Sequence, residues 1–325
     1  MRIACLSDAV MPSPTAGGHG LGRVAWTVAE GLRARSHDVT FFARSGSSFS
    51  GDLVMPPDAD GYGGEVALAR EALARHKDWP FDAFIDHGHL HHLASKLPTL
   101  PVVNVFHDAY QAYARNAALL STGQRALMPV EWENAAIVPN ALNPSDYVPL
   151  FDVTFPAYAL FIGAVADIKQ PLLAIEACAR LGIKLIMAGQ QVGGKFPVTD
   201  TGNFEYVGVV GGTFKAALYQ HARVFLQLGV NESFGLTTLE AGLHGTPVVG
   251  WPMGGTLDLV RNGVNGALVV LAGSDKVQNV CDAIERAWDI RRDQCRAVAE
   301  ALCEPAAQID RYEALCARVM RGETW

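Results

Sequence analysis

The sequence predicts an α/β protein made of two doubly wound domains, each a parallel sheet with helices on its faces. Two observations support this prediction. Short apolar segments alternate with segments in which apolar residues recur at helical spacing, and such alternation is typical of parallel sheets. The chain has 325 residues, half of them hydrophobic, which is enough for two domains with separate cores.

The first domain is expected to span residues 1–152. The turn-rich stretch 46–64 within it is predicted to be an irregular surface loop. Helices are predicted at 21–35 and 65–77, and strands at 2–7, 39–43, 81–85, 101–106, 126–130 and 136–138.

The second domain is expected to span residues 153–305 and to repeat the alternation. Its predicted strands lie at 158–163, 184–188, 206–208, 224–228 and 248–249. Its predicted helices lie at 170–181, 213–221, 275–292 and 293–302, with another that starts near Leu236 and ends at Gly245. A last helix is expected at 306–320, after Pro305.

The composition disfavours several classes of protein. The net charge is −7, so the basic excess of a nucleic-acid binder is missing. The sequence has no basic cluster that would bind an anionic membrane surface. It also has no apolar run of the roughly 20 residues that span a bilayer, so membrane association is not expected. The six cysteines form no CxxC pair, and the chain starts directly with a strand pattern instead of a signal peptide. A reduced, cytoplasmic protein is therefore expected.

Two carboxylates, Glu232 and Glu240, stand eight residues apart around a predicted helix start. Gly235 gives the turn between them its backbone freedom and lets a ligand come close. The amides of Leu236 and Thr237 are expected to point out of the helix N-terminus, where anions bind. Both carboxylates can therefore face one ligand whose phosphates lie at this helix end.

Histidines follow two of the predicted strands. His107 closes the strand at 101–106, and ligands of open α/β sheets bind at such strand ends. Four more histidines crowd the next-earlier strand end, but their spacing matches no zinc signature and no cysteine or acidic set accompanies them. We therefore expect helix-start and cleft-edge roles for them, and no metal site. These four are His87, His89, His91 and His92.

The glycine-rich segment at 17–22 could be mistaken for a dinucleotide fingerprint. Its spacing differs from G-x-G-x-x-G, and the strand at 39–43 ends in Ala43-Arg44, without the acidic residue that binds a ribose. NAD is therefore not expected as a cofactor.

Nearly the whole chain resembles the retaining glycosyltransferases of family 4, which have the GT-B fold; the resemblance is strong at 224–270, moderate at 1–43 and 158–190, and weak at 46–130. The resemblance lies in ESFGLTTLE, in EAGLHGTPVV, in Gly254-Gly255 with Asp258, and in NGVNGALV. It implies two Rossmann-like domains that face each other across a cleft, with the acceptor on the first domain and the nucleotide-sugar on the second. It also implies that helix 306–325 packs back on the first domain.

The resemblance further implies roles for single residues. Glu232 would approach the donor sugar and Glu240 the ribose of the nucleotide. His107 would lie near the transferred sugar, and Lys169 would neutralise the diphosphate. The catalytic residues would thus be His107, Glu232 and Lys169. The other donor-binding residues would be Ser233, Phe234, Gly235, Leu236, Thr237, Val209 and either Gly18 or Gly20 of the glycine-rich loop.

The donor would be a UDP- or GDP-sugar, with no cofactor and no metal, and the acceptor an unidentified soluble molecule. The oligomeric state is not indicated. The segment FIGAVADIKQP departs from the family, because Ala164 stands where an arginine is usual. An arginine clamps a diphosphate in a way that Lys169 alone does not reproduce. Arg23 and Lys195 are candidate substitutes.

Three functions are compatible with these patterns. The leading hypothesis is a retaining glycosyltransferase. The second is a non-catalytic nucleotide-sugar binding protein, which the missing arginine suggests. The third is another enzyme of the same fold, such as a sugar-nucleotide epimerase, and the spacing of Glu232 and Glu240 argues against it.

Overall fold

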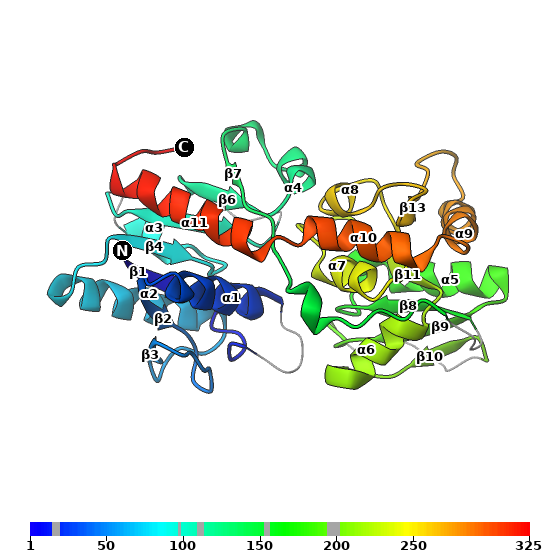
Figure 1. Ribbon diagram of the computed structural model, residues 1–325, viewed down its shortest axis with the longest axis horizontal. Coiled ribbons are helices and arrows are strands. Elements are labelled where there is room, and N and C mark those ends of the chain that lie inside the picture. Colours follow the sequence, from blue (N-terminus) through cyan, green and yellow to red (C-terminus); the bar gives the residue numbers. More distant parts are fainter. Residues whose placement is uncertain (15–19, 97–98, 109–113, 153–156, 194–201) are drawn as a thin grey trace. The chain divides into compact units, whose positions relative to one another are not determined.

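The computed structural model of this protein describes residues 1–14, 20–96, 99–108, 114–152, 157–193 and 202–325. The chain forms two compact units (Figure 1). Unit 1 comprises residues 1–140 and 305–325, and unit 2 comprises residues 141–304.

Unit 1 contains a seven-stranded parallel sheet with the strand order β3-β2-β1-β4-β5-β6-β7. The order reverses between β1 and β4, so the loops after these two strands diverge there. The strands are β1 (Arg2–Leu6), β2 (Asp38–Phe42), β3 (Asp52–Val54), β4 (Ala83–Asp86), β5 (Val102–Phe106), β6 (Ala117–Leu119) and β7 (Ala136–Ile137).

Helices cover both faces of this sheet. On one face, α1 (Gly20–Ala34) packs against the last helix of the chain, α11 (Pro305–Met320), and Gly31 makes the close approach possible because a Cβ there would lie 2.5 Å from Ile309. On the other face, α2 (Gly61–Asp78) and α3 (His92–Lys96) bury Leu68 and Leu93 against the strands. The remaining short elements are α4 (Thr122–Leu127), η1 (Val130–Trp132) and, in unit 2, η2 (Pro144–Asp146).

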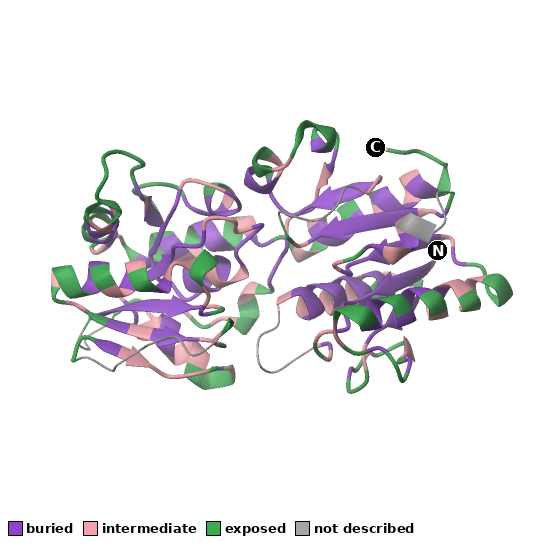
Figure 2. Cartoon of the chain, turned by 180° about the vertical axis from the view of Figure 1, so that it is seen from behind, coloured by how far each residue is buried: buried purple, intermediate pink, exposed green. Residues whose placement is uncertain are grey.

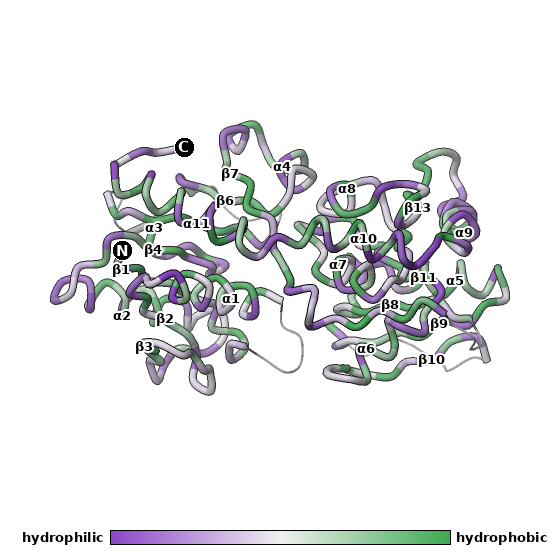
Figure 3. The backbone as a smooth tube through the Cα atoms, viewed as in Figure 1, coloured by the Kyte–Doolittle hydropathy of each residue, from purple (hydrophilic) through white to green (hydrophobic). Residues whose placement is uncertain are grey.

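Unit 2 contains a six-stranded parallel sheet with the order β10-β9-β8-β11-β12-β13. Here the order reverses between β8 and β11. The strands β8, β11 and β12 are buried along their whole length, as the inner strands of a parallel sheet require (Figures 2 and 3). The strands are β8 (Tyr158–Ile162), β9 (Lys184–Ala188), β10 (Phe204–Tyr206), β11 (Val224–Gln227), β12 (Val248–Gly250) and β13 (Gly266–Leu268).

Two layers of helices enclose the sheet of unit 2. One layer contributes Cys178 and Ile284 to the core, and the other contributes Leu218 and Ala241. The first layer holds η3 (Asp167–Lys169), α5 (Pro171–Leu181) and α9 (Lys276–Ala287); the second holds α6 (Gly212–His221) and α7 (Leu236–Leu243), with α10 (Arg292–Leu302) against α7 and α8 (Thr256–Leu259) near its start.

The boundary between the units lies at Asn140, although the sequence suggested residue 152. The segment after Asn140 belongs to unit 2 because Arg296 donates to the carbonyl oxygens of Tyr147 and Pro144, and the Leu150 amide donates to that of His244.

Three local predictions are wrong. Residues 126–130 do not form a strand: Ser121 caps α4 by accepting from the Gln124 amide at 2.8 Å, and Pro129 follows the helix end. The strand β6 (Ala117–Leu119) was missing from the prediction. The loop at 46–64 contains strand β3 and the first turn of α2, which begins at Gly61.

No helix in the described part of the chain is long and apolar enough to cross a membrane. All six cysteines are buried and free.

Candidate functional site

Each sheet has one point where the strand order reverses, and ligands of open α/β sheets bind beyond the carboxyl ends of the strands at such points. In unit 2 the reversal brings together the loop after β8, which carries Ala164 and Lys169, and the loop after β11, which carries Glu232. In unit 1 it brings together the ends of β1 and β4. Polar side chains gather at both points.

Lys169 and Glu232 form the central contact of the unit 2 site. The Lys169 ammonium lies 2.5 Å from Glu232 Oε2, and the Gln227 amide donates to the same oxygen at 3.2 Å. Gly229 makes room for this contact, because a Cβ there would lie 2.9 Å from Lys169 Cδ. The backbone around Lys169 is held by the Trp251 indole, which donates to the Gln170 side chain at 3.1 Å.

Gly254 and Gly255 hold the Glu232 loop in place from the other side. The Gly255 amide donates to the Glu232 carbonyl at 2.7 Å. A Cβ on Gly254 would lie 2.3 Å from that carbonyl oxygen, and a Cβ on Gly255 would lie 2.1 Å from the oxygen of Phe234. Only glycines allow this backbone approach, which explains the glycine pair noted in the sequence.

The loop then turns into α7 at Gly235, whose φ of +99° suits glycine. Ser233 and Phe234 are buried beneath the turn. The amides of Leu236 and Thr237 lie in the first turn of α7, where backbone N–H groups have no partner within the helix. The loop therefore carries Glu232, the partner of Lys169 from the loop after β8, just before the N-terminus of α7.

Glu240 lies in the second turn of α7 and is 3% exposed. The Lys215 ammonium, from α6, lies 2.7 Å from Glu240 Oε2, and the Tyr219 hydroxyl donates to the same atom at 3.2 Å. The sequence analysis did not identify Lys215. The only signal was its position four residues before Tyr219, on the same face of α6.

The structure places the other predicted donor residues as follows. Val209 is 61% exposed in the loop after β10, and Ala164 is exposed after β8. Gly20 begins α1, in unit 1. Gly18 and Lys195, predicted in the glycine-rich loop and as a substitute cation, lie outside the described residues. Arg23, the other candidate substitute, is half-buried on α1.

His107 follows β5 in unit 1, and its Nε2 lies 3.0 Å from Nδ1 of the fully buried His87. Burial lowers the pKa of His87 to about 3, with a further contribution from His91, so His87 is neutral. His87 Nε2 has no hydrogen-bond partner among the described residues. Because a buried N–H without an acceptor is rare, we assign the proton to His87 Nδ1, which then donates to His107. His107 thus keeps its own proton on Nδ1.

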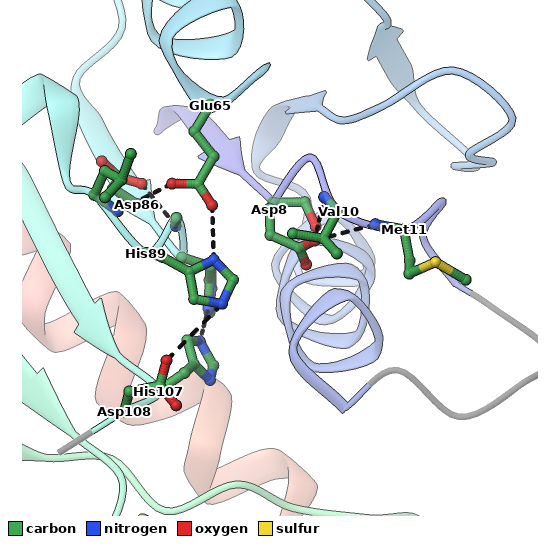
Figure 4. Close-up of polar contacts among 12 residues, drawn as sticks. Asp8, Val10, Met11, Glu65, Asp86, His89, His107 and Asp108 are labelled. Carbon is green, nitrogen blue, oxygen red and sulfur yellow. Dashed lines mark hydrogen bonds and ion pairs between the residues drawn. The ribbon is translucent and has the colours of Figure 1, made fainter. Parts of the chain in front are cut away.

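A second polar group lies beside this pair, at the end of β4 (Figure 4). Glu65 of α2 is 4% exposed, and its Oε1 lies 2.7 Å from His89 Nδ1, while the Leu90 amide donates to Oε2 at 3.0 Å. The other ring nitrogen of His89 lies 3.9 Å from Asp108 Oδ2. The imidazole is therefore placed between a buried and an exposed carboxylate.

The pKa values in this group follow from burial and charge. Burial raises the pKa of Asp86 to about 7, the Gly88 amide opposes the shift, and the charge of Glu65 adds to it. Burial alone would lower the pKa of His89, but the hydrogen bond to Glu65 and the nearby carboxylates outweigh it, so this pKa is raised. His89 therefore carries positive charge to a higher pH than a free imidazole does.

The sequence analysis found His89 but neither Glu65 nor Asp86. Glu65 was interpreted as the start of an ordinary helix, and its burial depends on the distant end of β4. No group of three histidine, cysteine, aspartate or glutamate side chains in the described ranges is arranged to hold a metal ion.

Comparison with known proteins adds independent information. Residues 156–289 match the family model described as Glycosyl transferases group 1. A D-inositol 3-phosphate glycosyltransferase of Mycobacterium leprae is 29% identical over 161 residues, which are 46% of this chain and 37% of that protein. The Mycobacterium avium protein of the same name is 32% identical over 136 residues, covering 38% of this chain and 31% of that protein. The chain thus spans only about a third of the curated relatives it matches.

Solved structures resemble the whole chain. AviGT4, described as a glycosyltransferase involved in avilamycin A biosynthesis, superposes with a TM-score of 0.75 at 20% identity and covers 100% of this chain and 99% of its own. Sucrose-phosphate synthase from Thermosynechococcus elongatus gives 0.80 at 16%, covering 99% and 100%. Anabaena HepE in complex with UDP-glucose gives 0.71 at 15%, covering 98% and 100%. At these identities the likeness establishes the fold.

Proposed function

We propose that this chain, which carries a group 1 glycosyltransferase domain in a GT-B fold, moves a sugar from a nucleoside-diphosphate sugar to an acceptor hydroxyl with retention of the anomeric configuration. The observation that supports this most directly is the Lys169–Glu232 contact of 2.5 Å at the start of α7. It joins a cation from the loop after β8 to a carboxylate that lies just before the N-terminus of α7.

The chemistry assigned to these groups follows from the charges of the reaction. Departure of a nucleoside diphosphate leaves negative charge on its oxygens, and preorganised positive groups stabilise it. Lys169 and the amides of Leu236 and Thr237 are the groups that we assign to the diphosphate. Glu232 then orients Lys169 and faces the sugar, and Glu240 binds the ribose hydroxyls. The proposal needs no metal.

The donor and the acceptor belong to the proposal as well. The HepE structure contains UDP-glucose, which supports a UDP-sugar here, with a GDP-sugar as the alternative. His107 is assigned to the sugar, with His87 fixing its ring. The acceptor is proposed to be a soluble molecule, because the net charge of −7 does not favour an anionic membrane surface.

A thermal-shift screen of UDP, GDP and ADP and their sugars tests the donor, because a ligand that binds only the folded state raises the melting temperature. Release of nucleoside diphosphate then tests turnover. We expect Lys169→Ala to abolish this release. The matched control is Lys184→Ala, which removes a surface lysine of the same unit that pairs with Glu205.

The second candidate function is non-catalytic binding of a nucleotide-sugar. It is favoured by Ala164, which leaves the end of β8 without a cationic side chain at that position. If the wild-type protein binds a donor but neither it nor Ala164→Arg releases nucleoside diphosphate, the binding function replaces the transferase. Faster release by Ala164→Arg supports the transferase with a weakened diphosphate clamp.

A further inference from the structure

The group around His89 has a composition that restricts what can bind there. Tyr62, on the first turn of α2, is 59% exposed, and its ring meets the His89 ring edge-on at 5.0 Å between centroids. Asp108 is 61% exposed on the side chain, on the other side of His89. An exposed aromatic ring next to an imidazole and a carboxylate offers both a flat apolar surface and directed hydrogen bonds.

Buried contacts hold the residues of this group in place. Glu65 is nearly fully buried and fixes the ring of His89, so the orientation of the imidazole does not depend on solvent. A side chain at Gly88 would crowd this group, because a Cβ there would lie 3.0 Å from Asp86 Oδ1 and 3.1 Å from Glu65 Oε2. The charged groups therefore lie close together on the end of β4, at the point where the strand order of unit 1 reverses.

The charges of this group sum to a negative value. Glu65 and His89 form one ion pair, while Asp108 adds a carboxylate, and the charge of Asp8 also acts on His89. Among the described residues no lysine or arginine forms an ion pair with Glu65 or Asp108. The guanidinium of Arg44 is taken up by the Val10 carbonyl oxygen and by Asp60.

A phosphate or carboxylate placed here would lie close to Asp108, and Glu65 already balances the charge of His89, so the like charges would repel each other. A hydroxyl is favoured instead, since it can donate to Asp108. An amino group would be attracted by the same carboxylate.

We propose that Tyr62, Glu65, His89 and Asp108 form the acceptor subsite of unit 1, and that it selects a polyhydroxy acceptor without phosphate or carboxylate groups. This inference rests on the proposed transferase function. It separates the chain from the relatives whose name specifies inositol 3-phosphate as a substrate. In this subsite Tyr62 stacks on the ring of the acceptor, Asp108 accepts from a hydroxyl, and Glu65 positions His89.

The test compares two acceptors that differ in one group, glucose and glucose 6-phosphate, with the donor that the thermal-shift screen identifies. We expect kcat/KM for the neutral sugar to be at least about ten times that for the phosphorylated sugar. A single unfavourable contact between like charges is enough to produce a factor of this size. Asp108→Lys should lower this ratio by at least about tenfold. Asp58→Lys, a reversal on the surface of the same unit, should leave the ratio unchanged.

Tyr62 gives a second, independent arm. Tyr62→Ala should lower kcat/KM for the neutral sugar severalfold, and Tyr62→Phe, which keeps the ring, should recover most of that loss. Tyr62 is 59% exposed, so neither variant threatens the fold.

The outcomes separate this inference from the proposed function. If the wild-type protein releases nucleoside diphosphate but uses glucose 6-phosphate as well as glucose, or better, the inference is wrong and the transferase function stands. If no donor turns over, the transferase function fails. Saturation-transfer NMR with the same two sugars then decides the subsite directly: binding of glucose 6-phosphate alone, or of neither sugar, overturns it.

Discussion

Gly229 shows how one missing side chain shapes the donor site. Its position lets Lys169 extend to Glu232, since a Cβ there would lie 2.9 Å from Lys169 Cδ. We therefore expect Gly229→Ala to displace the flexible lysine and to lower nucleoside diphosphate release by about tenfold or more, the cost of losing one preorganised charge contact. Gly163→Ala is the control, because nothing lies within 4 Å of its Cβ. Equal activity of the two variants would remove the Lys169–Glu232 contact from the mechanism.

Lys215 supplies the counter-charge of a buried carboxylate. Lys215→Met should therefore destabilise the protein by about 3–5 kcal/mol, the usual cost of leaving one partner of a buried ion pair. Glu240→Gln should cost less, because Lys215 can reach solvent. A urea-unfolding double-mutant cycle measures the coupling, and the double variant should recover much of the loss. Additive effects of the two changes would show that the pair does not stabilise unit 2.

Separately, Glu240→Gln should weaken nucleotide binding.

Asp86 makes stability depend on pH. The folded protein keeps its proton up to about pH 7, whereas the unfolded chain releases it near 3.8, so the wild-type protein loses stability as the pH rises through this window. Asparagine cannot ionise. The stability of Asp86→Asn relative to wild type should therefore increase by about 2–3 kcal/mol between pH 5 and pH 8, at roughly 1.4 kcal/mol per pH unit below pH 7.

Urea unfolding at several pH values measures this difference. Contributions of the other ionisable groups largely cancel, because both proteins share them. The difference should become constant above about pH 8. A difference that does not vary between pH 5 and pH 8 would mean that Asp86 is ionised throughout and stabilised by groups other than the Gly88 amide.

At the scale of elements, α11 buries a polar atom that no described residue compensates. Tyr312 is fully buried, and its hydroxyl has no hydrogen-bond partner among the described residues. Tyr312→Phe should thus stabilise the protein by about 1 kcal/mol. Tyr158→Phe is the matched comparison, because that hydroxyl donates to the Leu218 carbonyl at 2.7 Å, and it should destabilise by a similar amount. Thermal unfolding of both variants gives the two signs, and a loss in both would reveal a partner for Tyr312.

The elements that the sequence predicted well are those with strong periodicity. The helix at 21–35 and the strand at 184–188 agree with α1 and β9 because their apolar patterns are regular. Residues 126–130 were assigned wrongly because a short apolar run suits either a strand or a helix end. The Ser121 cap favours the helix α4 here, and the apolar run at 126–130 gives no indication of that cap.

The site divides in the same way. Glu232, Gly235 and Glu240 were identifiable because their spacing along one loop and helix is local. Lys215 and Glu65 were not, since each meets its partner only after strands far apart in the sequence have paired. Long-range ion pairs leave no local pattern, so sequence reasoning identifies the carboxylate of such a site more readily than the group that balances it.

At the scale of the molecule, the two units differ in how the chain builds them. Unit 2 is one continuous segment, whereas unit 1 is closed by α11 and by Trp325, whose indole donates to the Ala117 carbonyl at 2.9 Å. Residues 141–304 should therefore fold when expressed alone, with cooperative thermal unfolding. Residues 1–140 alone should lack it, because Tyr312 and Ile309 complete their core. Cooperative unfolding of 1–140 would show that α11 is dispensable.

On the ribosome, this arrangement imposes an order of events. Residues 1–140 are synthesised before residues 305–325, which complete unit 1. The face of β4 and β5 that α11 covers is therefore exposed while unit 2 is being synthesised. An apolar sheet face that is transiently exposed makes a folding chain prone to aggregate. A nascent chain of this protein should accordingly be most dependent on chaperones until α11 leaves the exit tunnel, and a stop codon near Glu304 should be more harmful to solubility than the loss of one helix suggests.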